Sequence, residues 1–109
     1  MADKVGIEVA SICRLKKILK IIGGKWKISI ICSIYSSGTL RYGELKRKID
    51  GITNTMLASS LRELEKDGLI SRKQYDEMPV RVEYELTPRC KTLIPILFKL
   101  NSWVEENIK

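Results

Sequence analysis

The sequence contains no histidine. This absence excludes the Ser–His and Cys–His pairs of nucleophilic catalysis and any metal site with an imidazole ligand. The three cysteines, Cys13, Cys32 and Cys90, are too far apart for the CxxC pairs of a structural zinc site and do not resemble a secreted disulfide framework. An enzyme based on carboxylates would need a pocket of grouped acids, but most acids lie in charge-interleaved segments such as RELEKD, which are typical of a solvated face. We therefore expect no enzyme and no cofactor or metal.

Long apolar runs are also missing. No segment approaches the roughly 20 apolar residues that a membrane-spanning helix needs. The N-terminal segment MADKVGIEVASICR contains two acids and no long apolar region of the kind found in a secretory signal. The 109 residues suffice for one domain that buries a core without disulfide or metal staples. The sequence thus predicts a single-domain cytoplasmic protein with no membrane partner.

Positive charge is abundant and unevenly distributed. The net charge is +7, and residues 1–50 hold the whole excess, with 11 Lys or Arg against 4 Asp or Glu. A basic half on a small domain favours a polyanionic partner, with nucleic acid ahead of a membrane surface because no segment sets a large apolar face against lysines. A basic surface that only aids solubility is the alternative.

Hydrophobic periodicity predicts a first helix over about residues 11–22, which Gly23 and Gly24 end. The next segment, KWKISIICSIY, is apolar nearly all round, so its periodicity fits a buried helix or a buried strand, and its length favours the helix. Within it we expect Cys32 to be a core residue. After a turn at SSG, TLR can form a very short strand, and YGELKRKI has the pattern of a two-turn helix.

The segment TNTMLASSLRELEKDGL, residues 53–69, carries the signals of a complete helix. Thr53 or Asn54 can cap its first turn, Gly68 suits its C-terminal end, and leucines at i, i+4 and i+7 predict one buried stripe. The opposite face carries small polar side chains and one arginine, which permit close approach to base edges and phosphates. The predicted base-reading residues are Thr53, Asn54, Thr55, Ser59 and Arg62.

The segments LISRKQY and VRVEYEL have β character and are separated by the turn-forming DEMP, which predicts a hairpin. Thr87 followed by Pro88 predicts the start of a last helix that runs to about Asn107. A short helix, a tight turn, a longer helix and a hairpin form, in this order, a helix-turn-helix followed by a wing. The predicted fold is mainly α with a small β-hairpin wing. A winged-helix module that binds protein or RNA is the alternative to DNA binding.

Basic residues surround the predicted helix-turn-helix and wing. Side chains of this kind hold DNA through its phosphates and set the position of the protein without reading sequence. The predicted backbone contacts are Lys25, Lys27, Lys46, Lys48, Arg72, Lys73 and Arg81.

Several fragments, taken in order, resemble the HxlR-type winged helix-turn-helix transcriptional regulators: Cys13, IIGGKW, RYGELKRKIDGIT, MLASSLRELEKDGLI and PVRVEYELT. The resemblance implies a dimeric DNA-binding regulator in which residues 53–67 form the reader helix and the terminal helices pair. It also implies that the Ile-rich segment is a helix. Where the family usually has Arg or Gln on the reader helix, this chain has Thr55 and Ser59, so the operator preference of relatives does not transfer.

The resemblance gives the following organisation of a single domain over residues 1–109: dimerisation helices at 11–22 and 88–107, a helix-turn-helix at 42–67, and a wing at 69–87. The last helix has an apolar stripe wider than one core contact requires, which favours a homodimer interface over a helix that only completes the core. Two-fold pairing would set the reader helices roughly 34 Å apart and predicts a pseudo-palindromic operator in double-stranded DNA. The predicted interface residues are Leu93, Ile96, Leu97, Leu100, Trp103 and Val104.

Cys13 is a candidate redox sensor, because some relatives in the family use a cysteine at this position in that way. It stands at the predicted start of a helix with Arg14, Lys16 and Lys17 nearby. The helix dipole and these cations both favour the thiolate, which is the reactive form. The alternative is that Cys13 is a small buried apolar residue.

Overall fold

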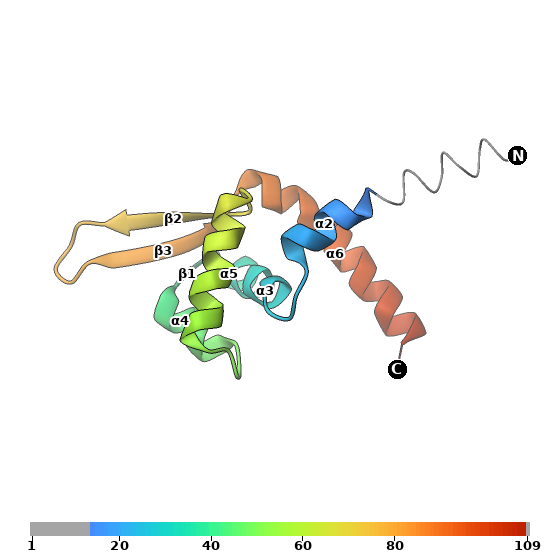
Figure 1. The fold of residues 1–109 in the computed structure, drawn as a ribbon, viewed down its shortest axis with the longest axis horizontal. Helices are drawn as coiled ribbons and strands as arrows, with labels where there is room; N and C mark the ends of the chain where they lie inside the picture. Colours follow the sequence, from blue (N-terminus) through green and yellow to red (C-terminus); the bar gives the residue numbers. More distant parts are fainter. Residues whose placement is uncertain (1–13, 109) are drawn as a thin grey trace, which may run out of the picture.

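The structure, a computed structural model, describes residues 14–108 and contains helices around a small sheet (Figure 1). The predicted start of the first helix and Cys13 lie outside these residues. The mainly helical fold with a hairpin is confirmed. In chain order the elements are α2 (Leu15–Ile22), α3 (Lys27–Ser37), β1 (Thr39–Arg41), α4 (Tyr42–Lys48), α5 (Asn54–Lys66), β2 (Ile70–Tyr75), β3 (Arg81–Leu86) and α6 (Pro88–Asn107).

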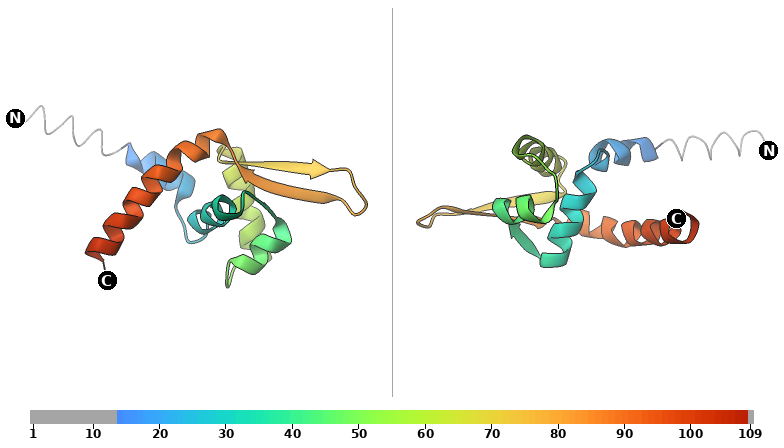
Figure 2. Two further views of the ribbon diagram at one scale, coloured as in Figure 1. Left: turned by 180° about the vertical axis from the view of Figure 1, so that it is seen from behind. Right: turned by 90° about the horizontal axis from the view of Figure 1, so that it is seen from below.

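The sheet has three antiparallel strands in the order β1-β3-β2. The hairpin pairs Ile70 with Leu86 at its root and Tyr75 with Arg81 near its tip, while β1 pairs Leu40 with Tyr84. The sequence indicated the hairpin and the short β1 strand, but the pairing of β1 with β3 connects segments more than 40 residues apart and had no local signal. The hairpin and α6 extend in opposite directions from the helical body, as the further views in Figure 2 also show.

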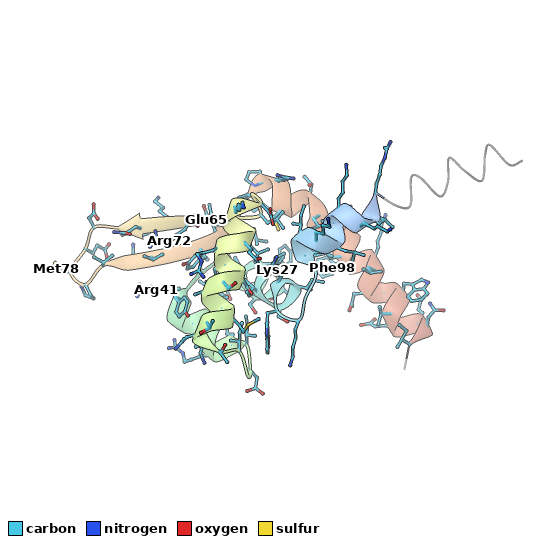
Figure 3. All side chains as sticks on the ribbon, viewed as in Figure 1. Lys27, Arg41, Glu65, Arg72, Met78 and Phe98 are labelled. Carbon is cyan, nitrogen blue, oxygen red and sulfur yellow. The ribbon has the colours of Figure 1, made fainter. Side chains whose placement is uncertain are left out.

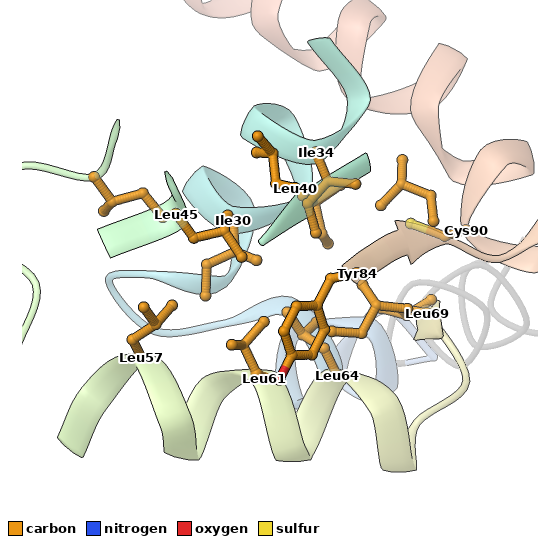
Figure 4. Packing of buried hydrophobic residues seen from close by; sticks show 14 of the residues in the cluster. Ile30, Ile34, Leu40, Leu45, Leu57, Leu61, Leu64, Leu69, Tyr84 and Cys90 are labelled. Atoms are coloured by element: carbon orange, nitrogen blue, oxygen red, sulfur yellow. The ribbon is translucent and has the colours of Figure 1, made fainter. Parts of the chain in front are cut away.

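The Ile-rich α3 lies at the centre of the core (Figure 4). Its residues Ile30, Ile31 and Ile34 have no exposed surface, and the α5 leucines pack below them. The prediction that this segment is a helix is confirmed. The prediction that Cys32 is a core residue is wrong, because its side chain is exposed. A helix turns by about 100° per residue, so Cys32 lies roughly 200° around α3 from Ile30, on the side away from the core.

Capping residues define both ends of α5 and the start of α6. Thr53 Oγ1 accepts a hydrogen bond from Met56 N at 3.1 Å and caps α5. Gly68 follows with φ +75°, a backbone conformation that strains other residues. Thr87 Oγ1 accepts from Cys90 N at 3.2 Å to cap α6 and donates to the Gly68 carbonyl at 2.6 Å. Thr87 therefore connects the start of α6 to the end of α5.

Candidate nucleic-acid interface

The interface is built on α4, a tight turn and α5. Ile49 and Ile52 are buried on either side of Asp50 and Gly51, and they anchor the turn to the core. Gly51 has φ +83°, so the turn uses a conformation that glycine adopts without strain. On α5, the buried Leu57, Leu61 and Leu64 hold the helix on α3 and the sheet and leave its opposite face exposed.

The outer face of α5 carries the predicted base-reading residues. Asn54, Thr55 and Arg62 are exposed, whereas Ser59 is half-buried. Thr53 is exposed, but its hydroxyl oxygen is occupied as the α5 cap. The first two turns and the start of the third therefore present small polar groups and one guanidinium, a set that can approach base edges closely and hydrogen-bond to them.

A depression of about 490 Å³ and a second of about 360 Å³ open on the described surface, and the smaller one lies beside the reader helix. Its walls come from α5, from the wing and from α4, and Arg62 and Arg72 line it from two different elements. Figure 3 shows Arg72 on the wing beside α5. Glu65 also lines it and lowers the net positive charge there. Of its seven lining residues only Arg62 and Arg72 were among the predicted site residues, and Tyr42 and Ala58 are among those that the prediction missed.

The basic residues predicted to contact phosphates are of two kinds. Some can still reach a phosphate, and others are paired with carboxylates of the domain. Lys48 and Lys73 are exposed on α4 and β2, Lys46 is half-buried on α4, and exposed Arg72 contacts Gln74 on its own strand at 3.4 Å. Lys25 is exposed, with its ammonium 4.7 Å from the Trp26 ring centroid. These groups can still approach a phosphate.

Lys27 does not fit its predicted role. Its side chain is only 11% exposed, and Nζ lies 3.2 Å from Oε2 of Glu63, whose side chain is 58% exposed, so the ion pair connects α3 to α5 at the edge of the core. A charge that is buried and paired in this way would have to break that pair to meet a phosphate, at a cost that a surface lysine does not incur. Its pairing with a helix 36 residues away had no signal in the sequence.

Arg81 is also engaged within the wing. Its guanidinium lies 3.3 Å from Glu77 and 3.5 Å from Glu83, and it stacks on the Tyr75 ring at 4.0 Å. Two carboxylates therefore neutralise it locally, and stacking fixes its direction. Its position supports a structural role in the wing rather than a phosphate contact.

The predicted interface residues of α6 also divide into two groups. Leu93 and Leu97 are half-buried and pack on the core. Ile96, Leu100, Trp103 and Val104 are exposed. Exposed Phe98 was missed by the prediction, and it meets Tyr35 of α3 edge to face at 5.7 Å.

Exposed apolar side chains also occur on other helices. Leu15 and Leu19 of α2 are more than half exposed. The larger depression, about 490 Å³, lies between α3 and α6 and has mostly apolar walls that include Ile28, Cys32 and Phe98. An exposed apolar surface such as this α3–α6 depression marks a candidate interaction site.

A short helix, a tight turn, a second helix with a polar outer face and a β-hairpin beside it define a winged helix-turn-helix protein. Residues 21–109 match the family model described as HxlR-like helix-turn-helix. The chain belongs to this family of transcriptional regulators, which confirms the resemblance seen in the sequence. Between residues 14 and 108, no helix has both the length and the apolarity of a membrane span.

Relatives and solved structures agree with this assignment. A Fusobacterium mortiferum protein named as a regulatory protein, MalR, is 46% identical over 95 residues, which cover 87% of this chain and 90% of the relative. YdzF of Bacillus subtilis, named as an HTH-type transcriptional regulator, is 42% identical over 98 residues, covering 85% and 90%. The redox regulator HypR in its oxidised form superposes with a TM-score of 0.80 at 39% identity, covering 89% of this chain and 99% of HypR.

Proposed function

We propose that the protein binds a pseudo-palindromic operator in double-stranded DNA as a homodimer and thereby regulates transcription. The observation that carries the proposal is the outer face of α5. Its first two turns and the start of the third expose Asn54, Thr55 and Arg62, while the opposite leucine face holds the helix in place. These turns enter the major groove, and the acidic C-terminal end of α5, which has Glu63 and Glu65, stays away from the DNA.

The exposed basic groups contact the backbone on both sides of the groove. Lys46 and Lys48 lie on the helix before the turn, and Arg72 and Lys73 lie on the wing strand. Lys25 completes this set near the start of α3. Because Lys27 and Arg81 are paired with carboxylates, they are left out of the set.

A homodimer would form through the exposed apolar surface of α6 and α2. Ile96, Leu100 and Trp103 are each more than half exposed and lie on one stripe of α6. A second copy would cover this stripe and the neighbouring α3–α6 depression. Two-fold pairing would then present two reader helices to successive major grooves, roughly 34 Å apart.

The test is DNA binding measured by fluorescence anisotropy with genomic fragments at a series of salt concentrations. The wild type should bind selected fragments tightly, with a steep loss of affinity as salt rises. Removing Lys46 and Lys48 together should flatten the log–log salt slope by about 0.9 for each lost phosphate contact. Lys91→Ala is the control for lost charge, since Lys91 is exposed on α6 and lies opposite the apolar stripe.

The same assay distinguishes base reading from backbone binding. Thr55→Ala should relax sequence preference and leave the salt slope nearly unchanged, because this side chain carries no charge. The reverse pattern would contradict the proposed division of roles. Binding of protein or RNA with no DNA competition would favour the interaction-module alternative.

A second candidate function is a cysteine-based redox response. HypR, at 39% identity, is named as a redox regulator and is solved in oxidised and reduced forms that both superpose with a TM-score of 0.80. In this chain Cys13 is the proposed sensor, since its sequence neighbours Arg14, Lys16 and Lys17 favour a thiolate. A hydroperoxide would transfer one oxygen atom to that thiolate, giving a sulfenic acid and the corresponding alcohol.

A further inference from the structure

Tyr42 contacts the first residue of the reader helix. Its single hydroxyl proton is shared between two acceptors of Asn54, the backbone carbonyl oxygen at 3.1 Å and the side-chain oxygen Oδ1 at 3.3 Å. Asn54 is exposed at the N-terminus of α5, where the proposed function places it against base edges. The α5 cap is made separately by Thr53, so the Tyr42 contact is not needed to start the helix.

The backbone around Tyr42 is anchored by strand pairing before it and by the first turn of α4 after it. Arg41 pairs with Glu83 at the end of β1, and the Arg41 N–H donates to Glu44 Oε1 at 2.9 Å, which closes the first turn of α4. The Tyr42 ring is half-buried and packs against the core. Its hydroxyl is thus fixed relative to α5 before any ligand arrives, and such preorganisation lowers the entropy cost of binding.

The Tyr42 contact engages the acceptor oxygen of the Asn54 amide and not its donor nitrogen. The amide has one acceptor oxygen and one donor nitrogen, and rotation about its side chain would present either to a partner. With Oδ1 held toward Tyr42, the Nδ2 group and its two N–H donors are left to face outward. In the major groove, guanine, adenine and thymine each offer an acceptor, whereas cytosine offers only the N4 donor.

We propose that Tyr42 is a positioning residue that sets the base preference of Asn54. By holding Oδ1, it makes Asn54 a hydrogen-bond donor and favours a base with a major-groove acceptor over cytosine at one position of each half-site. This inference rests on the proposed function, because it requires α5 to read DNA.

The experiment selects binding sites from a random DNA library with four proteins: the wild type, Tyr42→Phe, Asn54→Ala and Ser102→Ala. Tyr42→Phe removes only the hydroxyl, and Ser102→Ala removes an exposed hydroxyl that bonds within α6, outside the proposed DNA and dimer surfaces. The wild type and Ser102→Ala should enrich one motif. Tyr42→Phe and Asn54→Ala should both lose preference at the same base pair of each half-site, with Tyr42→Phe reducing discrimination there by about threefold to tenfold.

Three measurements make the result decisive. The salt slope of Tyr42→Phe should equal that of the wild type, since no charge is lost. The double variant Tyr42→Phe with Asn54→Ala should match Asn54→Ala alone, because Tyr42 acts only through Asn54. Thermal unfolding establishes that all proteins are folded at the temperature of selection.

Two outcomes would overturn the inference while leaving the proposed function intact: an unchanged motif for Tyr42→Phe, or an additional loss in the double variant. If the wild type itself enriches no motif, operator recognition fails and the inference fails with it. If Asn54→Ala keeps the wild-type preference, Asn54 is not a base-reading residue, and Tyr42 has nothing to position.

Discussion

Cys90 and Cys32 lie in different environments. Cys90 is fully buried at the start of α6, and burial, followed by the nearby Cys32, raises the pKa of its thiol. Cys32 is exposed on α3. Because the thiolate is the reactive form, the raised pKa makes Cys90 less reactive at neutral pH, and its reaction should require higher pH.

The first prediction concerns oxidation at the residue scale. Mild hydroperoxide treatment of the whole protein should oxidise Cys13 first and leave Cys90 unmodified at neutral pH, as peptide mass spectrometry would detect. Cys13→Ser should abolish any oxidant-dependent change in DNA affinity, whereas the matched Cys32→Ser should retain it. An unmodified Cys13 together with an unchanged DNA affinity would rule out the sensor role.

Polar side chains connect neighbouring helices in this fold. Thr87 both caps α6 and donates to the Gly68 carbonyl at 2.6 Å, so one side chain connects α6 to the end of α5. Lys27 and Glu63 make a second connection between α3 and α5 at 3.2 Å. These contacts connect α5 to α3 and to the start of α6.

The second prediction tests Thr87 at the element scale. Thr87→Ala should lower the free energy of unfolding by about 1–2 kcal/mol, since the cap of α6 is lost and the half-buried hydroxyl bond disappears. Urea denaturation measures the change. The control is Thr92→Ala in the same helix, whose exposed hydroxyl donates to the Arg89 carbonyl and should cost much less. Equal losses in the two variants would show that Thr87 has no special role.

Two surfaces of different chemistry lie on different parts of the molecule. The outer face of α5 and the wing carry the polar and basic groups proposed for DNA, while α2 and α6 carry exposed apolar side chains. Figure 3 shows Met78 at the tip of the wing and Phe98 on α6, on opposite sides of α5. A dimer formed through α6 would leave both reader helices free.

The third prediction concerns assembly. Leu100→Glu should convert the proposed dimer to a monomer, because a carboxylate would be buried at the interface without a partner, and sedimentation measures the mass. Operator affinity should fall with it. Met78→Glu is the matched control, since Met78 is 99% exposed on the wing and should not change the mass. A Leu100→Glu protein that keeps the wild-type mass would place the interface elsewhere.

Local chemistry determined the helices and strands of this protein. Thr53 and Thr87 give the starts of α5 and α6, Gly68 gives the turn between α5 and the hairpin, and alternation gives the hairpin strands. These signals act over a few residues, so they are visible in the sequence. The leucine stripe likewise determined which face of α5 is buried and which is open to a partner.

Only the tertiary structure decided which side chains are free to act. It exposed Cys32, paired Lys27 with Glu63, and placed the Tyr42 hydroxyl on Asn54. The last two contacts join residues 36 and 12 positions apart, and all three depend on how elements pack against one another. Sequence periodicity gives the face of a helix, but the neighbour on that face is set by packing of the whole chain.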